Sequence, residues 1–394
     1  MNMAADPAEA PAPVAGRRLK PLRVLHGPVN VGNQPWSLSR AERGLGLTSD
    51  VVINYNTWLG YPADRTLGEY AKKSREDVWR RLRFSLGIPF NYDVVHYYFG
   101  RSFMLWDDWG RVLGRSRGED LKALLDVRLA RAFGRRTFMT LQGCDARQAD
   151  RSNTLNAVTM CRDGACPAFG ACTTGIDDSR RAMIARLLPL MDRVFYLNPE
   201  VGRFVENGDF LPYSNVEIWD QKLELPVAGR RPRIVHAPSN GGIKGTNILL
   251  PVLAKLGERF DFELILIENK PHAEAMELYR SADLAIDQLL AGWYGGFAVE
   301  LMAMGKPVAA YIREEDRAFV PPQMWAEMPI LRIDSRTLED DLARILSAPE
   351  TLVEAGRRSR AYVERWHDPV KTAMALERVY RDPKAPLMLG ENRI

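Results

Sequence analysis

The stretch Ala282–Tyr311 reads ADLAIDQLLAGWYGGFAVELMAMGKPVAAY and predicts a strand, a loop, a helix and a second strand, in that order. Apolar residues before Asp287 and after Pro307 are typical of short buried strands in a parallel sheet. The helix formers of Phe297–Met304 lie between them. We therefore expect a βαβ unit whose helix begins directly after a glycine-rich loop.

A glycine pair, Gly295-Gly296, opens the predicted helix. The first N–H groups of a helix have no partner within it, and together with the helix dipole they favour an anion such as a phosphate. Glu300 follows on the first turn, where a carboxylate would repel a phosphate, so its oxygens are better suited to sugar hydroxyls. A diphosphate beside a ribose is a nucleotide, and we expect Gly295, Gly296, Phe297 and Glu300 to bind one.

A second glycine-rich turn, Pro238–Thr246, reads PSNGGIKGT and also precedes a predicted helix. Its Lys244 can meet a diphosphate as a point charge, while the glycines let the backbone come close to the ligand. The alternative is a surface lysine in an ordinary loop. The turn does not fit the Walker pattern GxxxxGK[ST], which argues against ATP hydrolysis of that kind.

Short apolar runs alternate with helical patterns along both halves of the chain, which predicts an α/β fold of two doubly wound domains. Their ligand should lie between them, at the carboxyl ends of the strands. We expect a disordered tail at 1–20, an N-terminal domain at 21–213, a linker at 214–231, a nucleotide-binding domain at 232–368, and a helix and tail at 369–394 that cross back to the first domain.

The composition is that of an ordinary globular protein, with 26% charged and 46% hydrophobic residues among 394. A net charge of +4 is too small to indicate nucleic-acid binding. No apolar run approaches the roughly 18 residues that span a bilayer, and the N-terminal segment lacks the apolar core of a secretory signal. We therefore expect a cytoplasmic protein that binds no nucleic acid.

Residues 233–311 resemble the C-terminal domain of GT-B glycosyltransferases, and most nearly that of the retaining glycosyltransferase family four. The resemblance rests on the K-G-T turn that begins at Lys244, the A-D-L-x-I-D strand that ends at Asp287, and the motif G-x-F-A-V-E-L-M-A-M-G-K-P-V that begins at Gly295. It implies two Rossmann-like domains facing a cleft. It also implies transfer of a sugar from a nucleotide-diphosphate sugar to an acceptor hydroxyl, with retention of anomeric configuration.

The resemblance further implies that Lys244, Glu300 and His96 form the catalytic set, and that no metal is required because Lys244 and the helix end balance the leaving-group charge. The donor is expected to be a UDP- or GDP-sugar, and the acceptor a small molecule or a glycan. Donor contacts are implied for Gly32, Ser239, Lys244, Gly245, Thr246, Asp287, Gly295, Gly296, Phe297 and Glu300.

The chain departs from the family pattern at two donor-site positions. Gly292 stands eight residues before Glu300, where the family has a second acidic residue, and Ser239 stands where an arginine is common. In the first half, D-V-V-H ending at His96 resembles the family's strand motif D-V-[IV]-H, and T-L-Q-G-C-D resembles its T-x-H-G-x-D segment with Gln142 in place of the histidine. His96 either orients a substrate or is satisfied at a strand end, and both interpretations stay open.

All four cysteines fall between residues 144 and 172: Cys144, Cys161, Cys166 and Cys172. We expect this Cys-rich segment to form an insertion in the first domain. Intervals of 16, 4 and 5 residues would let a loop wrap one tetrahedral structural Zn²⁺. The paired C-x-x-C knuckle is absent, so a disulfide or free thiols remain the alternatives, although a cytosolic setting argues against disulfides.

Residues 70–86 read YAKKSREDVWRRLRFSL and place Trp79, Leu82 and Leu86 at helical spacing among basic residues. Such a helix can lie on an anionic membrane surface or receive an acidic acceptor. The alternative is a solvated helix that packs on the domain through its aromatic stripe.

Two other functions fit the same scaffold. One is an epimerase that acts on the nucleotide sugar itself and therefore turns over the donor without any acceptor. The other is a non-catalytic nucleotide-sugar-binding protein, which would bind nucleotide without transfer or slow donor hydrolysis. Gly292 and Gln142 make this second alternative conceivable.

Overall fold

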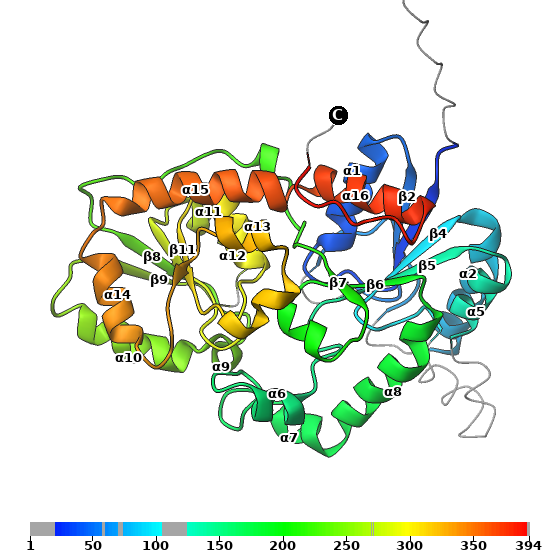
Figure 1. The fold of residues 1–394 in the computed structure, drawn as a ribbon, viewed down its shortest axis with the longest axis horizontal. Helices are drawn as coiled ribbons and strands as arrows, with labels where there is room; N and C mark the ends of the chain where they lie inside the picture. The colour runs from blue at the N-terminus through cyan, green and yellow to red at the C-terminus, as the bar shows by residue number, and fades with distance from the viewer. Residues whose placement is uncertain are drawn as a thin grey trace, which may run out of the picture.

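The computed structural model describes residues 20–56, 60–69, 74–104, 124–268, 270 and 272–391. These residues form two parallel β-sheets with flanking helices, and Figure 1 shows the two halves side by side. The predicted α/β fold of two doubly wound domains is confirmed. The stretch Ala282–Tyr311 forms β10 (Leu284–Ile286), α12 (Gly296–Ala303) and β11 (Val308–Ala310), as the sequence predicts.

The N-terminal sheet has the strand order β3-β2-β1-β4-β5-β6-β7. The chain runs outward from β1 to β3 and then returns to place β4 beside β1, so the switch point lies between β1 and β4. The strands are β1 (Arg23–Gly27), β2 (Thr48–Ile53), β3 (Arg65–Thr66), β4 (Val94–Tyr98), β5 (Arg136–Leu141), β6 (Arg193–Tyr196) and β7 (Gly208–Phe210). The helices are α1 (Gln34–Gly44), α2 (Arg75–Asn91), α5 (Leu125–Ala132), α6 (Ala149–Leu155), α7 (Phe169–Ala171) and α8 (Asp177–Leu187).

The C-terminal sheet has the order β12-β11-β10-β8-β9, and its switch point lies between β8 and β10. Ligands bind open α/β sheets at the carboxyl ends of the strands on either side of such a point. The further strands are β8 (Arg233–His236), β9 (Glu263–Leu266) and β12 (Leu331–Arg332). The further helices are α9 (Gly241–Lys244), α10 (Thr246–Leu256), α11 (His272–Arg280), α13 (Pro322–Glu327), α14 (Leu338–Leu346) and α15 (Thr351–Trp366).

Helix α12 is buried on nearly every side, because it lies between the second sheet and α15 (Figure 1). Its residues from Ala298 to Ala303 are all buried, including the side chain of Glu300. A helix that is apolar all round belongs inside a domain. The glycine loop before α12 is thereby fixed against the core.

The last helix, α16 (Pro369–Arg381), leaves the second domain and packs against α1 of the first (Figure 1). Tyr380 is buried in the same apolar cluster as Val24, Leu38 and Phe138. Its hydroxyl lies 2.7 Å from Nδ1 of His96, in the middle of β4. Helix α16 therefore supplies part of the apolar core of the first domain.

The two segments that join the domains are bonded to each other. Nδ1 of His367 lies 2.6 Å from the carbonyl oxygen of Tyr213, and Trp219 donates its indole N–H to Asp368 at 3.0 Å. Glu217 lies where these two segments meet. Its pKa is raised to about 7, first by burial and then by the charges of Asp220 and Asp368, while the charge of Arg40 opposes the rise.

The raised pKa of Glu217 should make the stability of the protein depend on pH. The folded state holds the Glu217 proton more tightly than the unfolded state, so this contribution is complete below about pH 4.5 and is lost as the pH rises through about 7. Glu217→Gln should remove that loss, and the difference in unfolding free energy between variant and wild type should grow over this range. Urea unfolding at successive pH values measures it, and parallel pH profiles would contradict the assignment.

Helix α2 turns Trp79, Leu86 and Phe90 outward, with exposed fractions of 63%, 50% and 62%. Val78 and Ile88 are buried on the opposite face, and Phe84 packs against the core. The interpretation that this helix packs through the stripe of Trp79, Leu82 and Leu86 is therefore wrong for Trp79 and Leu86. The positions of Tyr70, Lys72 and Lys73 fall outside the described residues.

Contact of α2 with a membrane surface stays a prediction. Arg83 is exposed at helical spacing from Trp79 and Leu86, so the outward face, continuing to Phe90, combines a cation with apolar side chains. Wild type should cosediment with vesicles rich in phosphatidylglycerol but not with phosphatidylcholine alone, and Trp79→Ala with Phe90→Ala should abolish this. Trp219→Ala removes an equally exposed tryptophan elsewhere and serves as control. Equal sedimentation of all three proteins would exclude α2 as the contact.

Candidate active site

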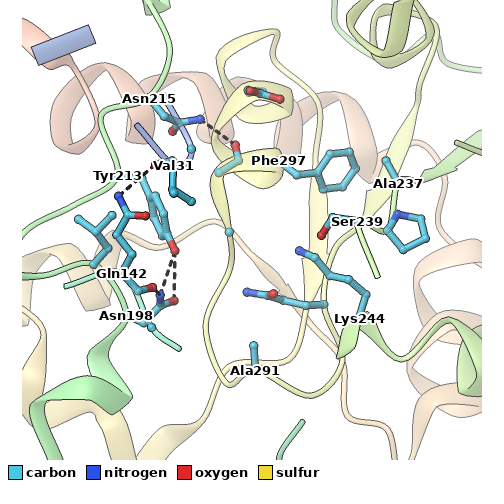
Figure 2. Close-up of a pocket in the computed structure, with 18 of the residues that line it drawn as sticks. Val31, Gln142, Asn198, Tyr213, Asn215, Ala237, Ser239, Lys244, Ala291 and Phe297 are labelled. Atoms are coloured by element: carbon cyan, nitrogen blue, oxygen red, sulfur yellow. Dashed lines mark hydrogen bonds between the residues drawn. The ribbon is translucent and has the colours of Figure 1, made fainter. Parts of the chain in front are cut away.

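A cavity of about 850 Å³ lies between the two domains. The loops after β1, β5 and β6 line it on one side, and the loops after β8 and β10 with the start of α12 line it on the other. Figure 2 shows Val31, Gln142 and Asn198 facing Ser239 and Lys244 across this space. Both walls are built from the carboxyl ends of strands, where a ligand of this fold class is expected.

Asp287 connects the two predicted phosphate-binding loops. Its Oδ1 accepts a hydrogen bond from Nζ of Lys244 at 2.6 Å, and its Oδ2 accepts one from the backbone N–H of Gly295 at 2.6 Å. The Asp287 side chain is fully buried and does not line the cavity. The prediction of Asp287 as a donor contact is therefore corrected, because this carboxylate lies behind the cavity wall and positions Lys244.

The amino end of α12 opens into the cavity at Gly296 and Phe297. Within the described part of the chain, no side chain or carbonyl accepts a hydrogen bond from these two amides. The amide of Gly295 already donates to Asp287. Of the three amides predicted to contact the donor, only those of Gly296 and Phe297 are therefore available. An incoming anion would satisfy them.

Glu300 lines the same cavity and is only 7% exposed. It is the fifth residue of α12 and so begins the second turn rather than lying on the first. Tyr61 and Tyr279 lie close to it: burial, followed by the charge of Glu300, raises the pKa of Tyr61 to about 12. The same two causes raise the pKa of Tyr279. The Glu300 carboxylate therefore lies at the cavity wall beside two tyrosines.

Gly245 and Thr246 do not line this cavity but hold Lys244 in place. Gly245 has a φ of 82°, and a side chain there would meet Leu289 at 2.9 Å. Nδ1 of His236 lies 2.8 Å from the carbonyl oxygen of Ile286, so it carries the proton, and Nε2 accepts the Thr246 hydroxyl at 2.8 Å. Burial lowers the pKa of His236 and favours this neutral form.

Two further predicted donor contacts, Gly32 and Ser239, line the cavity from opposite domains. Gly32 has a φ of 70°, which favours glycine, and Ser239 is exposed in the loop after β8. Neither offers a charge. The predicted residues that line the cavity are therefore Lys244, Ser239, the start of α12 and Glu300 on one wall, and Gly32 on the other.

His96 does not line the cavity. Its ring is fully buried, with Nδ1 2.7 Å from the Tyr380 hydroxyl and Nε2 2.7 Å from Oγ1 of Thr140. Burial, followed by the charge of His26, lowers its pKa well below the usual value. The prediction of His96 as a catalytic residue is corrected: it is a neutral histidine within the first domain, as its structural alternative required.

The four cysteines differ in exposure. Cys161 and Cys172 are buried in apolar packing, whereas Cys144 is exposed and lines the cavity. The fourth, Cys166, is half-buried. Among the described residues, no group of three or more His, Cys, Asp or Glu side chains is arranged to hold a metal ion. Cys144 nevertheless lies close enough to Cys161 for their charges to interact, and the structural zinc stays a prediction.

Sequence reasoning missed Arg147, which is 4% exposed and lines the cavity on the N-terminal wall. Its Nε donates to Oε2 of Glu200 at 2.7 Å. Sequence reasoning also missed Arg313, whose guanidinium fills the space beside Gly292: a Cβ at that glycine would lie 2.5 Å from Nη1. Residues so distant in the chain leave no spacing signal.

The arrangement of two facing Rossmann-like domains around an interdomain cavity is the GT-B glycosyltransferase fold. The sucrose-phosphate synthase of Thermosynechococcus elongatus is similar, with a TM-score of 0.57 and 14% identity over 92% of this chain and 99% of that one. The catalytic domain of starch synthase IV from Arabidopsis thaliana, bound to ADP and acarbose, has a TM-score of 0.51 and 12% identity over 92% and 99% of the two chains.

At these identities the likeness shows the fold alone. No protein-family model and no curated protein matches the sequence. In the part of the chain that the structure describes, none of the helices combines the length and the apolar character that crossing a bilayer requires.

Nucleotide binding should separate the roles of Lys244 and Glu300. Glu300→Gln should weaken binding of UDP or GDP about 10- to 100-fold, as for lost hydrogen bonds to a charged group, but leave inorganic pyrophosphate unaffected because it has no ribose. Lys244→Met should weaken the binding of both the nucleotide and pyrophosphate. Calorimetric titration measures all four combinations. Equal loss of nucleotide and pyrophosphate in Glu300→Gln would refute the ribose assignment.

Proposed function

We propose that the protein is a glycosyltransferase that moves a sugar from a nucleotide-diphosphate sugar to an acceptor hydroxyl, with retention of configuration. The observation that carries this proposal is the pairing of Lys244 with the open start of α12. Both are held by the Asp287 carboxylate on one wall of an interdomain cavity. A cation and free amides on the same wall suit a diphosphate.

In the proposed reaction, the bond between the anomeric carbon and the diphosphate oxygen breaks as the acceptor oxygen attaches to that carbon. The acceptor proton leaves with the departing diphosphate or passes to water. Negative charge on the diphosphate grows in the transition state, and Nζ of Lys244 with the amides of Gly296 and Phe297 stabilises it. Glu300 holds the ribose and so fixes where the anomeric carbon lies.

We propose a UDP- or GDP-sugar as donor. The structure of starch synthase IV holds ADP, which supports a nucleoside diphosphate as the ligand type without indicating the base. Tyr279 and Phe297 contact each other edge to face, with centroids 5.1 Å apart, and both line the cavity beside Glu300. Their rings offer a surface for the base.

We also propose that the protein acts in the cytoplasm. The four cysteines are unpaired in the structure, which suits a compartment that keeps thiols reduced.

An activity assay tests the proposal. Wild type should release nucleoside diphosphate from one member of a panel of UDP- and GDP-sugars, slowly in water and faster when a suitable acceptor hydroxyl is added. Lys244→Met should lower turnover by a factor of about 100, corresponding to roughly 2.7 kcal/mol of transition-state stabilisation. Conversion of the donor to an isomeric nucleotide sugar without acceptor would identify an epimerase instead. Tight nucleotide binding with neither reaction would identify a binding protein.

A further inference from the structure

A buried guanidinium faces the ligand cavity from the wall opposite Lys244. Arg147 lies in the loop after β5, and its Nε is bonded to Glu200 at 2.7 Å. The other hydrogen bonds that the Arg147 guanidinium donates go to sulfur: Nη1 lies 3.5 Å from Sγ of Cys144 and 3.8 Å from Sδ of Met160. Sulfur is a weak acceptor. Among the described residues, no oxygen accepts a hydrogen bond from Nη1 or Nη2.

Arg147 also belongs to a buried ionic network that carries surplus positive charge. Glu200 is shared between Arg147 and Arg313: its Oε2 lies 2.7 Å from Nε of Arg147 and 3.8 Å from Nη1 of Arg313. Arg313 pairs with Asp316 at 2.9 Å, and Asp316 pairs with Arg203 at 2.6 Å. Burial would raise the pKa of Glu200, but the charges of Arg147 and Arg313 outweigh it and lower that pKa. Three guanidinium groups therefore share two carboxylates.

A third carboxylate, Asp145, lies close enough to Arg147 for their charges to interact: burial raises the pKa of Asp145, and the charge of Arg147 opposes this rise. The oxygens of Asp145 accept hydrogen bonds from the backbone N–H groups of Gln142 and Gly143, at 3.0 Å and 2.7 Å. Asp145 makes no hydrogen bond or ion pair with Arg147. A buried charge without a full set of partners is costly, and a ligand in the cavity that Arg147 lines can supply the missing acceptor.

We propose that Arg147 binds an oxyacid anion, a phosphate or a carboxylate, on the acceptor substrate. The acceptor is then a polyhydroxylated molecule with a negative group rather than a neutral sugar. This inference rests on the proposed function, because Lys244 and the start of α12 already serve the donor diphosphate on the opposite wall. A cavity of about 850 Å³ is near the upper end for small-molecule sites and leaves room for a second ligand.

The test is a binding experiment on the whole protein saturated with UDP or GDP, whichever binds. Glucose 6-phosphate, glucuronate and glucose are titrated in turn by calorimetry. At least one of the two anions should bind 10-fold tighter than glucose, and comparison of the two tells phosphate from carboxylate. Arg147→Lys should weaken the binding of that anion about 10- to 100-fold, because a lysine keeps the positive charge but cannot donate two parallel hydrogen bonds as a guanidinium does.

Controls separate this role from folding. Arg147→Gln alone would leave the Glu200 charge buried, so it is paired with Glu200→Gln, which should keep the fold and still abolish the anion preference. Arg180→Gln removes a nearby guanidinium that bonds Cys172 and Asp177 but does not line the cavity, and should change nothing in these titrations.

Three results would overturn the inference. These are binding of the anions no tighter than that of glucose, an anion preference that survives in Arg147→Lys, and weaker nucleotide binding by Arg147→Lys, which would place Arg147 in the donor site. Failure of wild type to bind UDP or GDP at all would count against the proposed function itself. The two failures are therefore distinguishable.

Discussion

The buried carboxylate of Asp287 is the interaction on which the candidate site depends. It follows β10 and receives a hydrogen bond from Lys244 on one oxygen and from the Gly295 amide on the other. Each partner comes from a different loop, so the ion pair fixes the lysine against the start of α12. Removing one member of a buried pair costs about 3–5 kcal/mol. The ion pair therefore holds Lys244 in place on the cavity wall.

The first domain depends in a similar way on a partner from the far end of the chain. His96 lies in the middle of β4 and meets the hydroxyl of Tyr380 on α16. The D-V-V-H motif that ends at this histidine resembles a strand motif of a glycosyltransferase family and left a substrate-orienting role open, yet the side chain joins two segments of the fold instead. A shared motif identifies a strand position, whereas contacts in three dimensions decide what the side chain does.

What the sequence predicts well is what local pattern determines. The period of apolar residues and the glycines at Gly295 and Gly296 specify β10, α12 and β11, and the PSNGGIKGT turn places Lys244 at the cavity. The prediction fails where side-chain direction or long-range pairing matters. Arg147 and Arg313 meet Glu200 from distant parts of the chain. The spacing of the cysteines in turn gives no information on which way each thiol points.

The contact between Gly292 and Arg313 couples two positions of the site. Gly292 has a φ of 79°, and any side chain added there would overlap the guanidinium of Arg313. That guanidinium also donates to the carbonyl oxygen of Val158 in the first domain at 2.8 Å. An acidic residue at position 292 would have to adopt a backbone conformation that favours glycine and would also displace the guanidinium of Arg313. Displacing that guanidinium breaks its bond to Val158, so a second carboxylate at this position would weaken the contact between the two domains.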